Sequence, residues 1–469
     1  MPIIRNSEAP EYEVDVVVIG SGACGICAGL AASEAGASVL ILERDPKPTG
    51  STALSTGLIP AAGTRLQRDM GIEDSAERFA RDIMGKAKGQ TDKRMAMLIA
   101  ERSGPTVDWL AEHHGVPFRL VEGFLYPGHS QLRMHGVPRR TGEELQYALL
   151  AAAERASLQI VTSAQAQDLH VDDGRRVTAV GFVRPDGVRE VVGAKAVVLA
   201  CNGFGGNPDM LREYIPEMVE AEYWGHSGNT GDAVNWGKEL GAQTADLGSY
   251  QGHGAVAYPY GKPMMWGLIV EGGFQVNKDG VRFSNEASGY SEQAFEVIRQ
   301  QDRIAYNIYD ETCETPALGF TDYQEVQKLG GIKRAGSWAE LAALMGLPAD
   351  VLERTAAEVD EMKTGQRRDP FGRDFSKTKP LKPPFLAARI TGALFHTQGG
   401  LVVDDNAQVV HSSGEVMPNL FAGGGAARGV SGPSRWGYLS GNGLLCATVL
   451  GRLAGISAAR LAAASPELA

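Results

Sequence analysis

The N-terminal part of the chain combines short apolar runs with a glycine-rich turn. Residues 14–19 read VDVVVI, a β-branched apolar run that predicts a buried parallel strand. Residues 26–35 are rich in alanine and predict a helix, and residues 38–42 predict a second strand. The glycine turn at 20–25 separates the first strand from the helix. Together these segments predict one βαβ unit of about 30 residues.

Similar segments return later in the chain. Residues 175–182 and 188–192 predict paired strands around an Asp-Gly turn, and residues 196–200 (AVVLA) predict another buried strand. Near the C-terminus, an apolar strand with a glycine end is expected at 420–425 and a final helix at 441–453.

Residues 248–389 follow a different pattern, in which strands and helices are mixed. A charged stretch at 363–382, which contains DPFGRD and PLKPP, is typical of a solvated loop rather than of a basic binding patch. Because the features of the first unit return after residue 389, we expect an α/β domain that is interrupted by a second domain.

The turn between the first strand and the helix carries a recognisable chemistry. Gly20 permits the tight turn, Gly22 lets a pyrophosphate approach the backbone, and Gly25 lets the helix and the strand pack closely. The amides of the helix start then face the phosphates. Glu43, which ends the second strand, would accept hydrogen bonds from ribose hydroxyls and would disfavour the 2′-phosphate of NADP. This motif in this context predicts a dinucleotide site.

The composition excludes several classes of function. The 469 residues carry 45 Lys and Arg against 56 Asp and Glu, a net charge of −11, so we expect neither nucleic acid nor an anionic membrane as partner. No apolar run of roughly 18 residues and no apolar signal segment is expected, which makes the cytoplasm the default location. The five cysteines form no disulfide framework. Cys24 and Cys27 form a C-x-x-C pair, but at the start of a helix they are expected to be small packing residues.

The chain resembles the flavoproteins of the fumarate reductase/succinate dehydrogenase group, a family that includes 3-ketosteroid dehydrogenases. The resemblance runs from residue 14 to about residue 455. It rests on GSGACG with Glu43 and, in chain order, on TGSTALSTG (49–57), AVVLACNGFGGN (196–207), NTGDA (229–233), GVRFSNE (280–286), HTQGG (396–400) and PNLFAGG (418–424).

This resemblance implies an α/β fold, a Rossmann-like FAD-binding domain with an inserted α+β capping domain that binds substrate. The first part of the FAD-binding domain is placed at 1–247, the capping domain at 248–389 and the second part of the FAD-binding domain at 390–469. The implied cofactor-binding residues are Gly20, Gly22, Ala23, Cys24, Gly25, Glu43, Arg44, Gly50, Ser51, Thr52, Ser55, Thr56, Gly57, Asn202, Gly203, Asp232, Gly424 and Leu439.

Two departures from the family pattern concern the cofactor. Membrane-bound members attach FAD covalently through a histidine in the segment that corresponds to 50–52, where this chain has Ser51 and Thr52. FAD is therefore expected to bind non-covalently. The family's acidic or Asn residue after the late strand falls at Gly425, which leaves one ribityl contact open.

Members of the family transfer a hydride between the flavin and one carbon of a CH–CH unit, while a protein group transfers the neighbouring proton. Such chemistry needs donors that hold a carbonyl or carboxylate and one acid or base. By resemblance, His253 and His396 fall at the two substrate-binding histidines of fumarate reductases, and Arg435 falls at their carboxylate-clamping arginine. A guanidinium there argues for an acidic or strongly polarised substrate group. No metal site is expected.

The place of the catalytic arginine of fumarate reductases is taken by Tyr290, and their proton relay falls near Trp266 and Ile269, which carry no proton. Ketosteroid dehydrogenases have a tyrosine at this point and use it as the base. Tyr438 resembles the tyrosine that, with a glycine amide, holds their substrate ketone. A tyrosine with a pKa near 10 is a poor base at neutral pH, so cationic or donor neighbours are needed to lower that pKa. Arg435 or the two histidines could supply such a field. Packing for Tyr290 and an ion pair for Arg435 stay open as alternatives.

The sequence therefore predicts an FAD-dependent desaturase that introduces a C=C bond next to a carbonyl, in a small cyclic ketone or oxo-carboxylic acid. Tyr290 would remove the α-proton, and Tyr438 or a histidine would stabilise the enolate. The stretch with Tyr126, His129 and His135 is a candidate for the substrate entrance. The alternatives are a fumarate reductase-like reductase of unsaturated carboxylic acids, an oxidase of the aspartate oxidase kind and an electron-transfer subunit. An external electron acceptor is implied, whereas substrate, direction and oligomeric state stay open.

Overall fold

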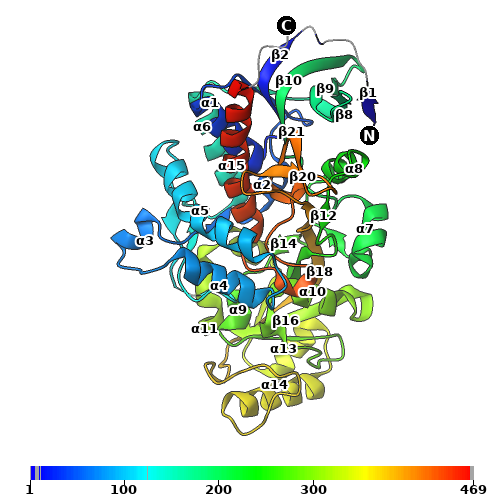
Figure 1. Cartoon of the computed structure of the whole chain (residues 1–469). Helices are drawn as coiled ribbons and strands as arrows, with labels where there is room; N and C mark the ends of the chain where they lie inside the picture. The colour runs from blue at the N-terminus through cyan, green and yellow to red at the C-terminus, as the bar shows by residue number, and fades with distance from the viewer. Residues whose placement is uncertain (1, 6–9, 11, 124, 465–469) are drawn as a thin grey trace.

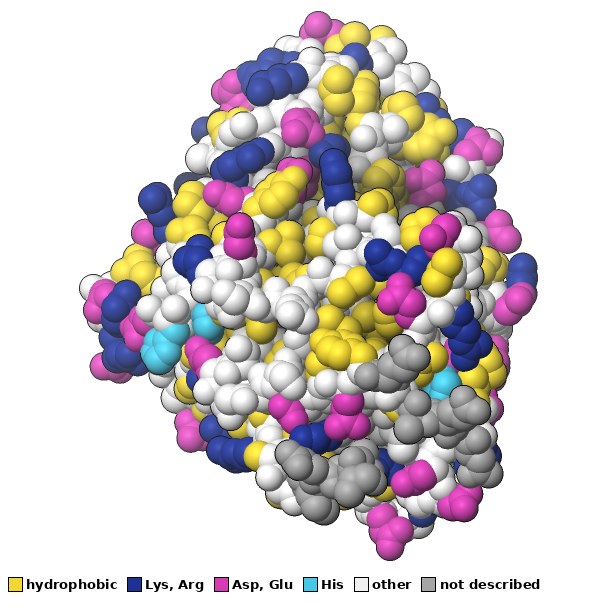
Figure 2. Space-filling view, turned by 90° about the horizontal axis from the view of Figure 1, so that it is seen from above, with side chains coloured by type: hydrophobic (Ala, Val, Ile, Leu, Met, Phe, Trp, Pro, Cys, Tyr) yellow, Lys and Arg dark blue, Asp and Glu magenta, His cyan; other side chains and the backbone are white. Residues whose placement is uncertain are grey.

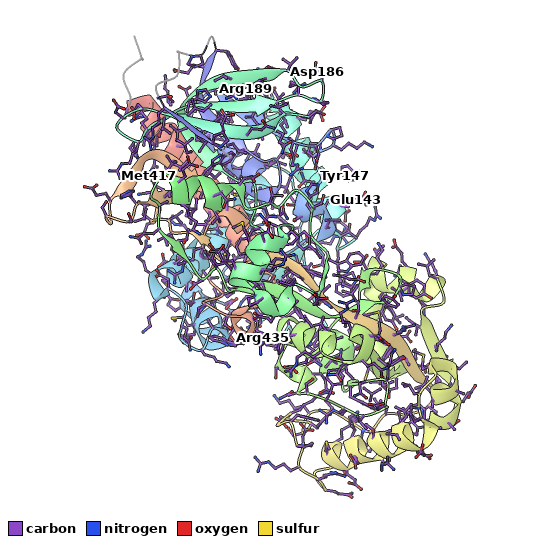
Figure 3. All side chains as sticks on the ribbon, turned by 90° about the vertical axis from the view of Figure 1, so that its right-hand side faces the viewer. Glu143, Tyr147, Asp186, Arg189, Met417 and Arg435 are labelled. Atoms are coloured by element: carbon purple, nitrogen blue, oxygen red, sulfur yellow. The ribbon has the colours of Figure 1, made fainter. Side chains whose placement is uncertain are left out.

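The structure is a computed structural model that describes residues 2–5, 10, 12–123 and 125–464. Figure 1 shows two lobes: an upper lobe that holds both ends of the described chain, and a lower lobe of yellow-green segments from its middle. Figure 3 shows the same two lobes from the side. On the described part of the face in Figure 2, positive and negative side chains are interspersed rather than gathered by sign.

The upper lobe is organised around a sheet that has nine strands within the described residues, in the order β1-β8-β9-β10-β2-β3-β7 with β21 beside β10 and β20 beside β21. The strands are β1 (Ile3–Arg5), β2 (Glu13–Ile19), β3 (Val39–Leu42), β7 (Gln159–Val161), β8 (Gln165–Val171), β9 (Val177–Val183), β10 (Arg189–Leu199), β20 (Gln408–Val410) and β21 (Val416–Ala422). β2 is parallel to β3 and β10, and β10 is parallel to β21, so the carboxyl ends of these strands meet at one edge. β9 and β10 are antiparallel, which confirms the predicted strand pair.

Helix α1 (Ala23–Glu34) follows β2 and completes the predicted βαβ unit with β3. It packs against the last helix, α15 (Asn442–Ala464), which is longer than the predicted 441–453. A Cβ on Gly451 or Gly455 would lie 2.3 Å or 2.1 Å from a carbonyl oxygen of α1, so the two helices approach at backbone distance. This contact holds the end of the chain against its beginning.

Further elements surround this sheet. The helices that precede residue 240 are α2 (Gly50–Leu54), α3 (Arg65–Asp69), α4 (Ala76–Lys86), α5 (Lys93–Glu112), α6 (Gly142–Arg155), α7 (Pro208–Tyr214) and α8 (Asp232–Glu239). Two small sheets contain β4 (Leu58–Pro60), β5 (Arg119–Leu120) and β6 (Met134–Gly136), and β12 (Thr244–Ala245) with β19 (Gly400–Leu401).

The lower lobe is built on a second sheet, with seven strands among the described residues, in the order β14-β13-β18-β16-β15 with β11 and β17 also on β18. The strands are β11 (Glu222–Tyr223), β13 (Tyr250–Ala257), β14 (Lys262–Pro263), β15 (Phe274–Val276), β16 (Ile304–Asp310), β17 (Ile332–Ala335) and β18 (Phe385–Thr397). The helices are α9 (Gly267–Val270), α10 (Tyr290–Ile298), α11 (Glu311–Glu314), α12 (Thr321–Lys328), α13 (Trp338–Met345) and α14 (Ala349–Lys363). This mixture of elements agrees with the predicted α+β insertion.

Strand β18 joins the two lobes. It pairs with β16 and β17 in its first half and with β13 and β11 in its second half, and the hydroxyl of its last residue, Thr397, accepts a hydrogen bond from Phe204 N at 3.3 Å. The predicted boundary after residue 389 therefore falls inside a continuous strand. The division into domains at 248 and 389 stays a proposal.

The charged stretch at 363–382 forms a loop after α14, but part of it is buried. Asp369 and Arg373 are each 6% exposed. Arg373 pairs with Glu286 at 3.0 Å, and Arg282 pairs with both Glu286 and Asp369. The prediction of a solvated loop is wrong for this part, because a buried arginine requires carboxylate partners and these come from a distant segment.

Helix α15 also corrects an expectation about membranes. Among the described residues it is the one helix that is long and apolar enough to cross a bilayer, with 23 residues and a mean hydropathy of 1.4. Its most apolar window is 56% buried inside the molecule, and its packing against α1 is typical of a core helix. Length and composition alone are therefore weak evidence for a membrane span.

Candidate functional site

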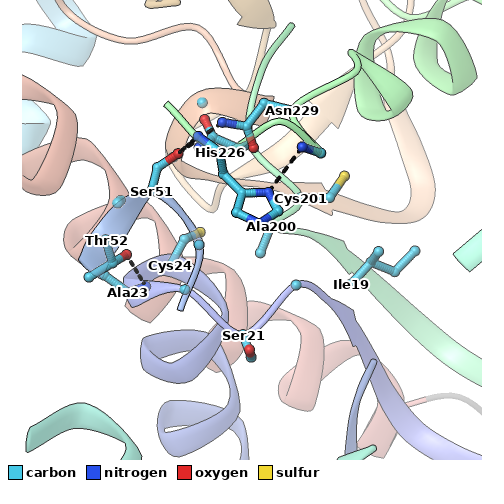
Figure 4. A pocket seen from close by; sticks show the side chains of 18 of the residues that line it. Ile19, Ser21, Ala23, Cys24, Ser51, Thr52, Ala200, Cys201, His226 and Asn229 are labelled. Atoms are coloured by element: carbon cyan, nitrogen blue, oxygen red, sulfur yellow. Dashed lines mark hydrogen bonds between the residues drawn. The ribbon is translucent and has the colours of Figure 1, made fainter. Parts of the chain in front are cut away.

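The carboxyl ends of the parallel strands open onto a large cavity, which we call the first cavity. Its empty space is about 1250 Å³ including its open mouth. Figure 4 shows Ser21, Ser51, Cys201 and His226, from four separate segments, around it. Open α/β sheets bind their ligands at this edge.

The turn after β2 is sterically restricted to glycine. Gly20 has a φ of +105°, and a Cβ on it would lie 2.6 Å from the Ala200 carbonyl oxygen. A Cβ on Gly25 would lie 1.8 Å from the Gly20 carbonyl oxygen, so α1 touches the turn itself. Gly22 is the N-cap of α1 and lines the first cavity. Because it is a glycine, no side chain caps the helix start. The wall at this point is backbone, as phosphate binding requires.

Glu43 lies on the wall beside this turn and is 7% exposed. Its Oε2 accepts a hydrogen bond from Ser21 N at 3.1 Å and another from the Ser21 hydroxyl, and its Oε1 accepts one from Asp45 N at 2.9 Å. These bonds hold the carboxylate where the ribose contact is expected.

The 49–57 loop bridges two parts of the cavity wall. Thr52 Oγ1 accepts a hydrogen bond from Ala23 N at 2.9 Å, drawn as a dashed line in Figure 4. On the other side, Ser51 Oγ accepts hydrogen bonds from Asn229 Nδ2 at 2.8 Å and from His226 N at 3.4 Å. The loop is therefore anchored to the start of α1 and to the segment before α8.

His226 lines the first cavity and was not predicted. Its Nδ1 accepts a hydrogen bond from Gly228 N at 3.0 Å, and its Nε2 lies 2.7 Å from Asp45 Oδ2. Both ring nitrogens are therefore engaged by protein groups. The available signal was its position shortly before the NTGDA segment.

Most of the predicted cofactor residues line the first cavity: Gly20, Gly22, Ala23, Cys24, Glu43, Arg44, Gly50, Ser51, Thr52, Ser55, Asn202, Asp232 and Gly424. Those that do not line it are Gly25, Thr56, Gly57, Gly203 and Leu439. Thr56 lines a neighbouring cavity, and Leu439 is 0% exposed in the hydrophobic core. The Leu439 side chain therefore packs inside the protein, and a cofactor contact at residue 439 stays a prediction. Lining residues that were not predicted include Ser21, Asp45, Gln165, Trp236, Gln398 and Cys446.

The glycine at position 425 has a local explanation. A Cβ there would lie 2.1 Å from Asn202 Oδ1. Asn202 has a φ of +66°, and its Oδ1 accepts a hydrogen bond from Gly203 N at 2.8 Å. The missing side chain at 425 leaves room for the Asn202 amide on the cavity wall.

Cys24 and Cys27 are free and buried, and burial raises the pKa of Cys27 to about 12. Such inert thiols confirm the prediction that the C-x-x-C pair consists of packing residues.

A second cavity, with about 1030 Å³ of empty space, adjoins the first. Both are lined by Ser51, Ser55, His396 and Leu444. The walls of the second cavity come from segments far apart in the chain, which include Tyr126, Met134, His253, Trp266, Tyr290, Phe320, Phe395 and Tyr438. Because the shared residues include the 49–57 loop, a ligand in the second cavity lies next to the loop predicted to cradle the flavin.

Tyr290, the first residue of α10, lies at the centre of this arrangement. His253 stacks on its ring at a centroid distance of 5.1 Å, and Tyr438 meets it edge-on at 6.1 Å. The side chains of Ser440 and Tyr438 lie close enough to the Tyr290 hydroxyl to oppose the rise of its pKa. His396 in turn meets Tyr438 edge-on at 5.7 Å. The structure thus brings four of the five predicted catalytic residues to one cavity.

These groups are uncharged at neutral pH. Burial raises the pKa of Tyr290 above its ordinary range. Burial also lowers the pKa of His253 to about 3 and that of His396 to about 4. The expectation that cationic neighbours lower the pKa of Tyr290 is therefore wrong, because desolvation keeps both histidines neutral and the tyrosine protonated.

Arg435 lies outside the lining of both cavities. Its Nη1 is 3.8 Å from Glu217 Oε1, its guanidinium lies 4.1 Å from the centre of the Phe295 ring, and its side chain is 32% exposed. Figure 3 shows it at the edge of the upper lobe, beside the lower lobe. Neither lining supports its predicted role as a carboxylate clamp, which stays a prediction.

The second cavity is mainly apolar, and its apolar walls include Leu54, Leu58, Met134, Trp224, Met264, Met265, Trp266, Phe320 and Phe395. Among the described residues that line it, none is Lys or Arg, and Asp322, which pairs with Lys262 at 3.3 Å, is the single carboxylate. Of the predicted entrance residues, Tyr126 lines the cavity, whereas His129 and His135 are buried outside its lining. Such walls favour an uncharged ligand over a dicarboxylate.

Comparisons with known proteins agree with this architecture. The model of the family described as FAD binding domain matches residues 15–444. A urocanate reductase of Eggerthella lenta is 30% identical over an alignment that covers 97% of this chain and 76% of the relative. A probable fumarate reductase of Shewanella frigidimarina is 28% identical and is covered to 76%, with 96% of this chain aligned.

Two solved structures are also similar over nearly the whole chain. The open conformation of a flavocytochrome c3 fumarate reductase matches with a TM-score of 0.81 and 27% identity, over 97% of this chain and 79% of that one. A 3-ketosteroid-delta4-(5alpha)-dehydrogenase from Rhodococcus jostii, solved in complex with 4-androstene-3,17-dione, matches with a TM-score of 0.77 and 28% identity, over 98% of this chain and 100% of that one. These matches confirm the predicted resemblance and fold class.

Proposed function

This chain belongs to the FAD binding domain family, and from that premise we propose that it is a dehydrogenase of uncharged, largely apolar carbonyl compounds. It is a flavin-dependent oxidoreductase, as its relatives are. The proposed reaction introduces a C=C bond between the carbons α and β to the carbonyl. The observation that carries the proposal is the pair of tyrosines, Tyr290 and Tyr438, that meet edge-on in an apolar cavity that adjoins the cofactor cavity.

The first cavity fits FAD in its chemistry. Its glycine turn offers backbone to a pyrophosphate, and the buried carboxylate of Glu43 offers acceptors to a ribose. When bound, FAD supplies a hydride acceptor. We infer that it binds non-covalently, since Ser51 and Thr52 occupy the loop and both ring nitrogens of His226 are engaged by Gly228 and Asp45.

Tyr290 is assigned the proton step. The substrate α C–H bond breaks and its proton passes to the Tyr290 oxygen, while the β hydrogen would leave with its electron pair as a hydride, for which bound FAD would supply the acceptor. The electron pair of the α C–H bond becomes the second bond of the C=C unit. Because this direction requires the phenolate, the raised pKa of Tyr290 makes desaturation faster at higher pH.

Tyr438 is assigned the task of holding the substrate carbonyl. Burial raises its pKa well above the ordinary range, while the backbone N–H groups of Gly443 and Gly441 oppose that shift. Those two amides lie at the start of α15, where the helix dipole favours negative charge. Donors gathered at this point would stabilise the enolate as it forms.

The substrate is proposed to be uncharged because the lining of the second cavity, within the described residues, offers no Lys or Arg. A carboxylate there would be desolvated without a cationic partner. Since Arg435 has Glu217 as its own partner, it gives no reason to exclude a bulky ketone. The similar dehydrogenase that was solved with a steroid diketone supports this substrate class.

Anaerobic mixing of the FAD-loaded protein with a saturated 3-ketosteroid, cyclohexanone or succinate tests the proposal through loss of the visible flavin absorbance. We expect a ketone, but not succinate, to bleach the flavin. Tyr290→Phe should slow bleaching by about 10²- to 10⁴-fold while FAD stays bound. Tyr147→Phe, at a tyrosine that is 61% exposed, is the matched control. Bleaching of Tyr290→Phe at the parent rate would refute the assignment.

A second candidate is reduction of a C=C bond conjugated to a carbonyl, and the protonated state of buried Tyr290 favours it. In that direction the phenol donates its proton to the α carbon. Mixing the dithionite-reduced protein with 2-cyclohexen-1-one would return the flavin absorbance if this direction operates.

The remaining alternatives give different outcomes in the same experiments. Return of the absorbance with fumarate would favour a reductase of unsaturated acids, and rapid peroxide release with substrate would favour an oxidase. A protein that binds FAD and responds to none of these compounds would fit an electron-transfer subunit. An external electron acceptor is part of the proposal in the desaturation direction.

A further inference from the structure

A fully buried arginine lies behind the wall of the second cavity, immediately before β6. Arg133 is 1% exposed, and its Nε and Nη2 each lie 2.9 Å from an oxygen of Asp74. It also pairs with Asp82 of α4, and its guanidinium lies 4.6 Å from the centre of the Phe79 ring. Two carboxylates and an aromatic face thus hold this side chain in one orientation.

One N–H of Arg133 reaches His129. Arg133 Nη1 lies 3.3 Å from His129 Nδ1, and an arginine only donates, so Nδ1 accepts and the ring proton stands on Nε2. His129 Nε2 lies 3.0 Å from the Ser440 carbonyl oxygen, which only accepts. Both contacts require the same neutral tautomer. Burial, with Arg133 as the next cause, lowers the pKa of His129 to about 3, so that tautomer persists at working pH.

Ser440 connects this pair to the proposed catalytic group. Its side chain lies close enough to the Tyr290 hydroxyl to oppose the rise of the Tyr290 pKa, and it lines the second cavity although it is 3% exposed. Its neighbour Gly441 has a φ of +85°, and a Cβ there would lie 2.4 Å from Pro60 Cδ. The 438–441 turn is therefore wedged against Pro60 on one side and hydrogen-bonded to His129 on the other.

We propose that His129 is a positioning residue which, with Arg133 behind it, holds the 438–441 turn so that Ser440 and the Tyr438 ring stay in place beside Tyr290 in the second cavity. The proposal rests on the proposed function in one respect, namely that Tyr290 transfers the proton. The contacts from Arg133 to Tyr290 do not depend on that function.

Two substitutions at one position separate the hydrogen bond from the bulk of the ring. His129→Gln places an amide N–H near the position of Nε2 and retains a donor to the Ser440 carbonyl oxygen. His129→Asn reaches only the position of Nδ1 and leaves that oxygen without its donor. Ser440→Ala deletes the hydroxyl of the residue that connects His129 to Tyr290.

The first readout needs no substrate. The FAD-loaded protein is labelled with 3-fluorotyrosine, and the ¹⁹F signal of Tyr290 is identified by its loss in Tyr290→Phe. We expect this signal to move in His129→Asn and in Ser440→Ala and to stay near the parent position in His129→Gln. The second readout is anaerobic bleaching by the ketone that bleaches the parent protein. There we expect His129→Asn to be slower by about tenfold or more, with unchanged FAD content and KM, and His129→Gln to recover most of that loss.

An unmoved Tyr290 signal in His129→Asn, or equal shifts in the Asn and Gln variants, would overturn the proposal. If His129→Asn does not fold, Ser440→Ala decides, and an unmoved signal there overturns it. Failure of the proposed function would give a result that can be distinguished from these outcomes. In that case Tyr290→Phe bleaches at the parent rate, or no ketone bleaches the parent, whatever the fluorine signal of the His129 variants shows.

Discussion

The two adjoining cavities are built in different ways. The first is formed largely by backbone, with a glycine turn, strand ends and the start of α1 contributed by short contiguous segments. The second is formed by side chains from β13, α10, β18 and the turn before α15. Tyr126 and Tyr438, which are far apart in sequence, both line it. The shape of the first cavity therefore depends on the positions at which the chain has no side chain. The shape of the second depends on the directions in which its side chains point.

This difference explains why the two cavities tolerate change differently. A backbone wall has no alternative rotamer, so any added atom displaces the chain itself. A wall of aromatic side chains can change its chemistry one group at a time without closing. A substitution in the wall of the cofactor cavity is therefore expected to abolish cofactor binding altogether. A substitution in the wall of the substrate cavity is expected to remove one function and leave the others.

Gly25→Ala should have the largest effect on the first cavity. Its Cβ would lie 1.8 Å from the Gly20 carbonyl oxygen, so α1 and the glycine turn must separate. We expect loss of bound FAD and a decrease in the free energy of unfolding of about 1–3 kcal/mol. The flavin-to-protein ratio and thermal unfolding measure both. Gly85→Ala in α4, where a Cβ would meet nothing within 4 Å, is the control and should retain FAD. A yellow Gly25→Ala protein with full FAD content would contradict the backbone argument.

The pH dependence of bleaching tests the second cavity. Because the pKa of Tyr290 is raised, its phenolate is a minor form from about pH 6 to pH 9 and increases about tenfold with each pH unit. The bleaching rate should rise with the same slope until another step limits it. His253 and His396, with pKa values of about 3 and 4, stay neutral over this range and should add no inflection near neutrality. Stopped-flow traces across this pH range provide the measurement. An inflection near the ordinary histidine pKa, or a slope that persists in Tyr290→Phe, would assign the proton step to another group.

Arg435→Gln should have the smallest effect. Its side chain lies outside both linings and is 32% exposed beside Glu217, so its loss costs less than about 1 kcal/mol of stability. FAD content and the bleaching rate are expected to stay within about twofold of the parent values. Glu217→Gln, which removes the partner, should behave alike. A large rise in KM for an acidic substrate in Arg435→Gln, but not in Glu217→Gln, would support the role of Arg435 as a carboxylate clamp.

The residues that sequence reasoning located correctly are those under local backbone constraint. The VDVVVI run, the Gly20–Gly25 turn and Glu43 form the βαβ unit as expected, and most of the predicted cofactor residues line one cavity. Leu439 and Arg435 lie outside both cavity linings, because a motif fixes the path of the backbone but not the direction of each side chain. His226 was missed because its cavity position depends on Asp45, which is distant in sequence.

The sequence by itself determined the cofactor turn, the α/β class with its insertion, and the presence of a tyrosine at position 290. These follow from steric rules that act over a few residues. Only the tertiary structure decided that Tyr290, Ser440 and Tyr438 line one cavity, that both histidines are neutral and that the substrate cavity lacks a cation in its described lining. The physical reason is that protonation depends on desolvation, and desolvation is set by segments that meet only when the chain folds.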